Sequence, residues 1–180
     1  MDSILLNLKH KLICKMSDYI KKFEFKETPK KITYIEEPPL ELNEDFVFYH
    51  NKSKVRRELT PLQYLFKSFT KNPLLALGIQ DSFLKKEFTD KYFITLFAAS
   101  EIVKKTNEII TEYTDIEISQ GCFYLVTTSD YMLLLTKDID GLKSGAKTME
   151  EIFNQVLEDY FTKENFDDFI KIPQFRIYNC

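Results

Sequence analysis

The chain has 180 residues, of which 44% are hydrophobic and 29% charged, and its formal net charge is -3. A chain of this length and composition buries enough apolar surface to fold without a metal or disulfides, so we expect one α+β domain over residues 1–180. The acidic balance argues against nucleic acid as the main partner, and the four scattered glycines exclude a glycine-rich phosphate loop.

The N-terminus lacks the basic start and the apolar length of a signal peptide, and no uncharged run is long enough to span a membrane. The three cysteines, Cys14, Cys122 and Cys180, are far apart and form no CxxC pair. This spacing argues against a disulfide scaffold and against a structural zinc site. We therefore expect a cytoplasmic protein with no cofactor, no metal and no membrane association.

The first half of the chain begins with apolar side chains at helical spacing over residues 3–24, which predicts an amphipathic helix. Two strands follow at residues 31–36 and 46–50, where apolar, aromatic and β-branched side chains concentrate. Between them, Pro38 and Pro39 stiffen an acidic segment that we interpret as a surface loop.

Thr60-Pro61 and Asn72-Pro73 each combine a capping residue with a proline, so each predicts a helix start. Apolar residues at helical spacing then predict a long helix over residues 90–113. Because residues 92–100 are apolar on nearly every side, we expect this helix to be the central, buried one.

Residues 115–137 contain three short apolar runs, which predict an antiparallel meander within a mixed or antiparallel sheet packed against several helices. The second and third runs are apolar on both faces, so we expect both faces to be covered. Thr148 and Glu151 form a capping box for a helix over residues 148–161. A short helix from residue 163 and a strand over residues 174–178 close the chain.

Cys122 follows the turn residue Gly121, and His50 lies upstream, so a cysteine nucleophile activated by a histidine is one hypothesis. A small buried core residue is the other interpretation of Cys122. Asp138 and Asp140 have the spacing of two carboxylates on a divalent cation, but with Gly141 they also match an ordinary turn.

Two charged clusters are the candidate partner-binding residues. The acidic cluster surrounds the two prolines and comprises Glu36, Glu37, Glu41, Glu44 and Asp45. The basic cluster comprises Lys52, Lys54, Arg56 and Arg57.

The absence of a phosphate loop, a metal motif and a basic groove from the sequence favours a non-catalytic intracellular protein that binds another protein, as immunity proteins, inhibitors and adaptors do. Two alternatives stay open. One is a cysteine-dependent enzyme that uses Cys122 with His50, which requires the two side chains to meet. The other is a regulatory module that binds a small ligand in an apolar cavity.

Overall fold

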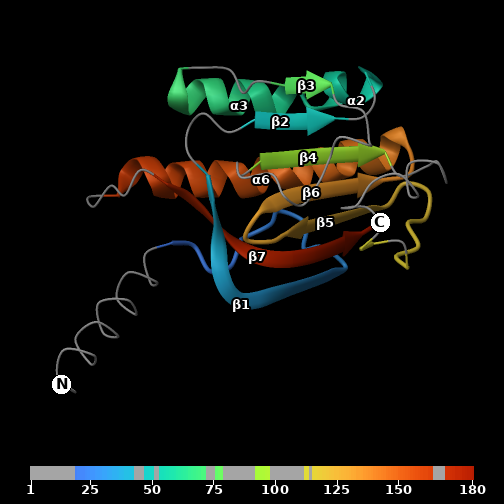
Figure 1. Cartoon of the computed structure of the whole chain (residues 1–180), viewed down its shortest axis with the longest axis horizontal. Coiled ribbons are helices and arrows are strands. Elements are labelled where there is room, and N and C mark those ends of the chain that lie inside the picture. The colour runs from blue at the N-terminus through green and yellow to red at the C-terminus, as the bar shows by residue number, and fades with distance from the viewer. Residues whose placement is uncertain are drawn as a thin grey trace.

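The structure is a computed structural model that describes residues 19–42, 47–50, 53–71, 76–78, 92–97, 112–113, 115–163 and 169–180. Within these residues, one mixed sheet has the strand order β1-β7-β5-β6-β4-β2-β3 (Figure 1). The strands are β1 (Lys31–Leu42), β2 (Val47–His50), β3 (Ala76–Gly78), β4 (Tyr92–Phe97), β5 (Phe123–Thr127), β6 (Tyr131–Thr136) and β7 (Ile170–Asn179).

The two halves of the sheet differ in strand direction. β1, β7, β5 and β6 pair antiparallel, whereas β6, β4, β2 and β3 pair parallel. The parallel half is possible because helices connect β2 to β3, a crossover that parallel neighbours require. The predicted α+β class with a mixed sheet is confirmed, and the strands predicted near residues 31–36, 46–50 and 174–178 are present.

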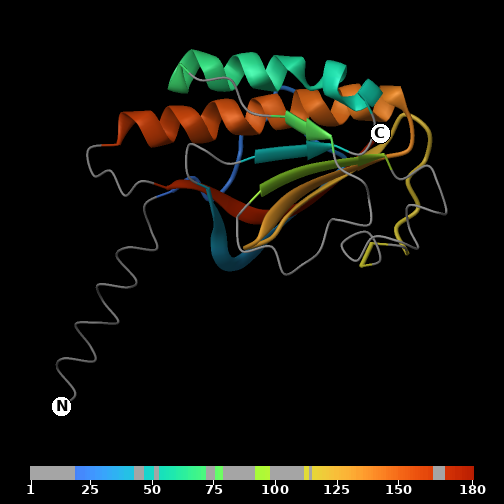
Figure 2. The ribbon, with the colours of Figure 1, turned by 45° about the horizontal axis from the view of Figure 1, so that its top comes forward.

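The helices are α2 (Ser53–Glu58), α3 (Thr60–Thr70) and α6 (Ile139–Thr162), and they lie on one side of the sheet (Figure 2). The predicted helix start at Thr60-Pro61 is confirmed, but the N-cap is Leu59 and no side chain caps the helix, so the capping role predicted for Thr60 is wrong. α3 ends at Lys71, whose backbone has a φ of 66° and whose N–H donates to the carbonyl oxygen of Lys67 at 3.0 Å. A left-handed residue of this kind terminates a helix.

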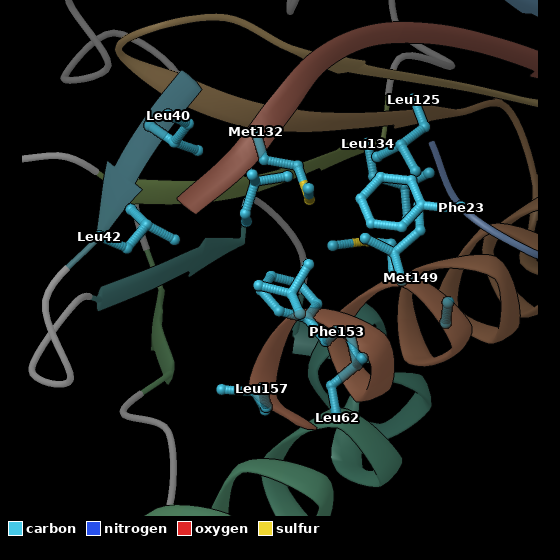
Figure 3. Packing of buried hydrophobic residues seen from close by; sticks show 14 of the residues in the cluster. Phe23, Leu40, Leu42, Leu62, Leu125, Met132, Leu134, Met149, Phe153 and Leu157 are labelled. Carbon is cyan, nitrogen blue, oxygen red and sulfur yellow. The ribbon is translucent and has the colours of Figure 1, made fainter. Parts of the chain in front are cut away.

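The main core fills the space between the sheet and α6. Phe123, Leu125, Met132 and Leu134 point from the central hairpin toward the buried face of α6. Figure 3 shows Met149, Phe153 and Leu157 of α6 facing this space, with Leu62 of α3 on the other side of α6. Phe66 of α3 packs edge-on against Phe153, with 5.0 Å between the ring centroids.

The opposite face of the hairpin is also apolar and covered. Tyr124, Val126, Tyr131, Leu133 and Leu135 form a second buried cluster. Side chains from the segment before β5 pack on it, namely those of Tyr113, Ile116 and Ile118. The prediction that both faces of these strands are covered is therefore confirmed.

Three predicted elements are wrong where the structure describes them. Residues 92–97, expected in the central helix, form strand β4, which pairs with β2 and β6 on its two sides. An all-round apolar run suits a strand buried on both faces as well as it suits a buried helix. Residues 76–78, which were expected near the end of a helix from Pro73, form β3. Residues 116–119, which belong to the first of the three runs predicted as a meander, are not a strand.

The long helix also begins earlier than predicted. α6 starts at Ile139, so Thr148 lies inside it, where its hydroxyl donates to the carbonyl oxygen of Ser144 at 3.2 Å. The predicted capping box at Thr148 is therefore wrong, and Asp138 is the N-cap.

The predicted helix over residues 3–24 lies mostly outside the described residues, but residues 19–24 are not helical. Phe23 instead inserts into the main core, where its ring packs edge-on against Phe175 at 5.7 Å. Its backbone N–H donates to the Tyr34 hydroxyl at 2.9 Å. The short helix predicted from residue 163 also falls largely outside the described residues.

Candidate functional site

The predicted partner-binding residues do not form one site. Glu36, Glu37 and Glu41 lie on β1, at one edge of the sheet, and all three are exposed. Arg56 and Arg57 are exposed on α2, which packs near β2 toward the opposite edge (Figures 1 and 2). Four predicted residues cannot be placed: Glu44, Asp45 and Lys52 lie outside the described residues, as does the side chain of Lys54.

The acidic prolines were interpreted as a loop between strands, but they lie within β1 as a large bulge. Ile35 pairs with Gln174 of β7 and Leu40 pairs with Ile172, so residues 36–39 face Pro173 alone. Three extra residues on one strand force it to bend and to project from the ladder. β1 bends sharply along its length in Figures 1 and 2. We call residues 36–39 the acidic bulge.

A buried glutamine fixes the acidic bulge to the sheet. The side chain of Gln174 is 5% exposed, and its amide Nε2 donates to the carbonyl oxygen of Pro38 at 2.7 Å. Pro38 and Pro39 restrict the backbone of the same four residues. The bulge is therefore a stiff feature whose Glu36 and Glu37 side chains point into solvent.

Glu41 and the two glutamates of the acidic bulge lie opposite different kinds of residue on β7. Glu41 lies directly opposite Lys171 of β7, and cross-strand neighbours of opposite charge attract each other. The β7 residue that faces Glu36 and Glu37 is Pro173, which has no charge. The bulge thus presents two carboxylates at a sheet edge, where a basic surface could approach them.

The structure does not bring Cys122 and His50 together. Cys122 forms a disulfide with Cys180, so it has no free thiol in this state, and the prediction against disulfides is wrong. His50 ends β2, and β4 and β6 separate β2 from β5. Three strand spacings amount to about 14 Å, far beyond hydrogen-bond reach.

Asp138 has a structural role at the start of α6. Its carboxylate accepts hydrogen bonds from the N–H groups of Gly141 and Gly121, each at 2.8 Å. These bonds, first to Gly141 and then to Gly121, hold the pKa of Asp138 below its usual value. Asp140 follows in the first helical turn. Within the described part of the chain, no cluster of three His, Cys, Asp or Glu residues has a geometry that would hold a metal ion.

A shallow groove of about 420 Å³ runs between the segment around Glu24, α3 and the outer face of α6. Charged and amide side chains dominate its lining, which comprises Glu24, Lys26, Leu65, Lys147, Glu150, Glu151, Asn154 and Gln155. Several of these polar groups anchor the chain itself. The Gln155 amide accepts from the Glu24 N–H at 2.9 Å and donates to the Glu24 carbonyl oxygen at 2.7 Å. This polar groove differs from the apolar cavity expected of a small-ligand module.

Sequence reasoning missed Gln174 and the role of Cys180. Gln174 is one of several polar residues of β7, and nothing in the sequence indicates that it faces Pro38. Cys180 is opposite Cys122 only because β5 and β7 are neighbours, and no sequence spacing reveals that pairing. Among the described helices, none is both long and apolar enough to cross a membrane.

No protein-family model matches this chain, and no curated protein sequence matches it. Solved structures resemble its fold. CpGH84D superposes with a TM-score of 0.59 at 14% identity, over 89% of this chain and 24% of that protein. The GH20 exo-β-N-acetylglucosaminidase from Vibrio harveyi gives a TM-score of 0.53 at 8% identity, over 91% of this chain and 20% of that one.

The N-acetyl-β-hexosaminidase of Streptomyces plicatus also gives a TM-score of 0.53, at 10% identity, and the match covers 89% of this chain and 28% of the hexosaminidase. The chain therefore spans about a quarter of the length of the solved proteins that it resembles. At these identities the likeness concerns the fold alone.

Proposed function

We propose that this protein is a non-catalytic module that binds a basic surface of another protein through the acidic bulge of β1. The observation that carries the proposal is the four-residue bulge, in which Glu36 and Glu37 are exposed on a backbone stiffened by two prolines and anchored by Gln174. Binding through a stiff segment costs less conformational entropy than binding through a mobile loop, because the loop must first become ordered.

Two further observations support a binding role. The solved proteins with a similar fold are longer chains in which the matched region is 20% to 28% of the whole, so this fold can exist beside other protein surfaces. The cysteine proposed as a nucleophile is in a disulfide and is about three strand spacings from His50. The second observation counts against the cysteine-dependent enzyme that would use Cys122 with His50. The cytoplasmic location stays a prediction.

The test compares two double variants that change the net charge equally. In the bulge variant, Glu36 and Glu37 are both replaced by Lys. In the control, Glu117 and Glu158 are replaced by Lys; both are exposed and lie away from β1. Thermal melts of both variants should match that of the wild type, because all four side chains are on the surface.

Each protein is immobilised and exposed to an extract of the cells that produce it, and captured proteins are identified and then purified for titration. We expect a protein with a basic surface that binds the wild type and the control but binds the bulge variant at least about tenfold more weakly, a loss of about 1.4 kcal/mol. Raising the salt concentration should weaken wild-type binding as well. Equal binding by all three proteins would exclude the acidic bulge as the contact surface.

A further inference from the structure

The disulfide lies where the β-ladder itself brings two cysteines together. In the antiparallel register of β5 and β7, Phe123 pairs with Asn179, and one further step along each strand places Cys122 opposite Cys180. Their Cα atoms are 4.1 Å apart. Because backbone pairing holds the two residues adjacent, the thiols stay close together when the bond is reduced, and re-formation of the bond is an intramolecular step.

The two sulfur-bearing residues differ in exposure. Cys122 is 3% exposed, whereas Cys180 is an exposed residue. Thiol–disulfide exchange requires the attacking thiolate to reach one sulfur while the other sulfur leaves. Access therefore favours attack on Cys180, with Cys122 as the leaving sulfur.

The surroundings of Cys122 also accommodate the reduced form. Its sulfur lies 3.5 Å from the carbonyl oxygen of Gln120, which can accept a hydrogen bond from the S–H group. The neighbouring turn is held independently of the disulfide, because the Gly121 N–H donates to Asp138. Reduction therefore leaves a buried thiol that has a hydrogen-bond acceptor nearby.

We propose that Cys122 and Cys180 form a reversible thiol–disulfide exchange site whose reaction partner is a small thiol or disulfide of the glutathione class. A small thiolate attacks Cys180, the bond between the two cysteines breaks, and Cys122 leaves as a thiolate that takes a proton from water. A second small thiolate attacks the mixed disulfide, releasing the small disulfide and the Cys180 thiolate. The protein gains two electrons, and the two small thiols are oxidised; the reverse sequence restores the bond.

This reaction would change the structure at one corner of the sheet. Tyr178, two residues from Cys180, faces Tyr124 in the β5–β7 register and packs against the second buried cluster. Loss of the covalent bond removes the restraint at the end of β7, so we expect residues 179 and 180 to open more often, while the pairing of Tyr178 with Tyr124 keeps the two thiols within reach of each other. Such a site is compatible with the cytosol, where the disulfides that occur are mostly transient and redox-sensing.

The experiment uses the full chain with Cys14→Ser, so that only the two paired cysteines react. The protein is equilibrated with reduced and oxidised glutathione at a series of ratios, quenched with acid, and mapped by mass spectrometry. We expect a reversible transition between disulfide and dithiol forms, with mixed disulfide on Cys180 and none on Cys122. Hydrogen exchange at residues 179 and 180 should be faster in the reduced form, while exchange in β6 should not change.

Two single variants distinguish the sulfurs. Cys122→Ser should accumulate glutathione on Cys180, and Cys180→Ser should leave Cys122 unmodified until urea unfolds the protein. Circular dichroism confirms that each variant is folded before it is used. A disulfide that resists glutathione at every ratio unless the protein is unfolded would overturn the proposal, as would glutathione found mainly on Cys122.

Discussion

Replacing Asp138 by Ala tests how the longest helix is held to the sheet. One carboxylate oxygen caps α6 through the Gly141 N–H, and the other accepts from the Gly121 N–H in the turn before β5. The same side chain thus joins the start of α6 to the start of the hairpin. Its removal leaves two backbone donors without their present acceptor.

The expected loss is the sum of two modest terms. Removal of an Asp N-cap costs about 1 kcal/mol. The bond to Gly121 adds up to about 1 kcal/mol, because water reaches this half-exposed site and replaces part of the interaction. We therefore expect Asp138→Ala to lower the free energy of unfolding by about 1 to 2 kcal/mol.

The charge of Asp138 makes part of this contribution depend on pH. The pKa of Asp138 is lower in the folded protein than in an unfolded chain, where it is about 3.9. The charged form therefore stabilises the fold above pH of about 4, and this stabilisation is lost as the pH falls through the folded pKa. Asp138→Asn keeps an acceptor but has no charge, so its stability should approach that of the wild type in acid.

Urea denaturation followed by circular dichroism measures both effects, with Thr148→Ala as the control. Thr148 lies inside α6, where Ala has the higher helix propensity, so this change should alter the free energy of unfolding by less than about 0.5 kcal/mol. If Thr148→Ala destabilises the protein more than Asp138→Ala does, or the Asp138→Asn difference is the same at every pH, the assignment of the cap is refuted.

Three further substitutions test the packing, each measured by urea denaturation. Phe153→Ala should cost about 3 to 5 kcal/mol, because Phe153 is fully buried and packs against Phe66; a cost below about 1 kcal/mol would contradict this packing. Thr136→Val should stabilise the fold by about 1 kcal/mol, since the Thr136 hydroxyl is buried without a hydrogen-bond partner in the described structure; destabilisation would reveal a partner. Gly141→Ala should destabilise by about 1 to 2 kcal/mol despite its higher helix propensity, because the new Cβ would overlap the Cys122 carbonyl oxygen; a gain would show that α6 can shift freely.

The candidate site was predicted in part. The exposed glutamates at residues 36 and 37 and the stiffening by Pro38 were evident from the sequence, but the bulge was not. A bulge exists only relative to a partner strand, and here Gln174 of the partner strand β7 is 136 residues from Pro38 in the sequence. The sequence offered the basic and the acidic clusters as two candidate surfaces, and the strand order places α2 and β1 toward opposite edges of the sheet.

Local patterns determined the α+β class, the hairpin that is apolar on both faces and the start of α3, because each depends on neighbouring residues alone. The identity of residues 92–97 as a strand depended on tertiary structure, since an apolar run takes its conformation from what surrounds it, and here β2 and β6 supply backbone partners on both sides. The pairing of Cys122 with Cys180 depended on it as well, because only the register of β5 against β7 places two distant cysteines opposite each other.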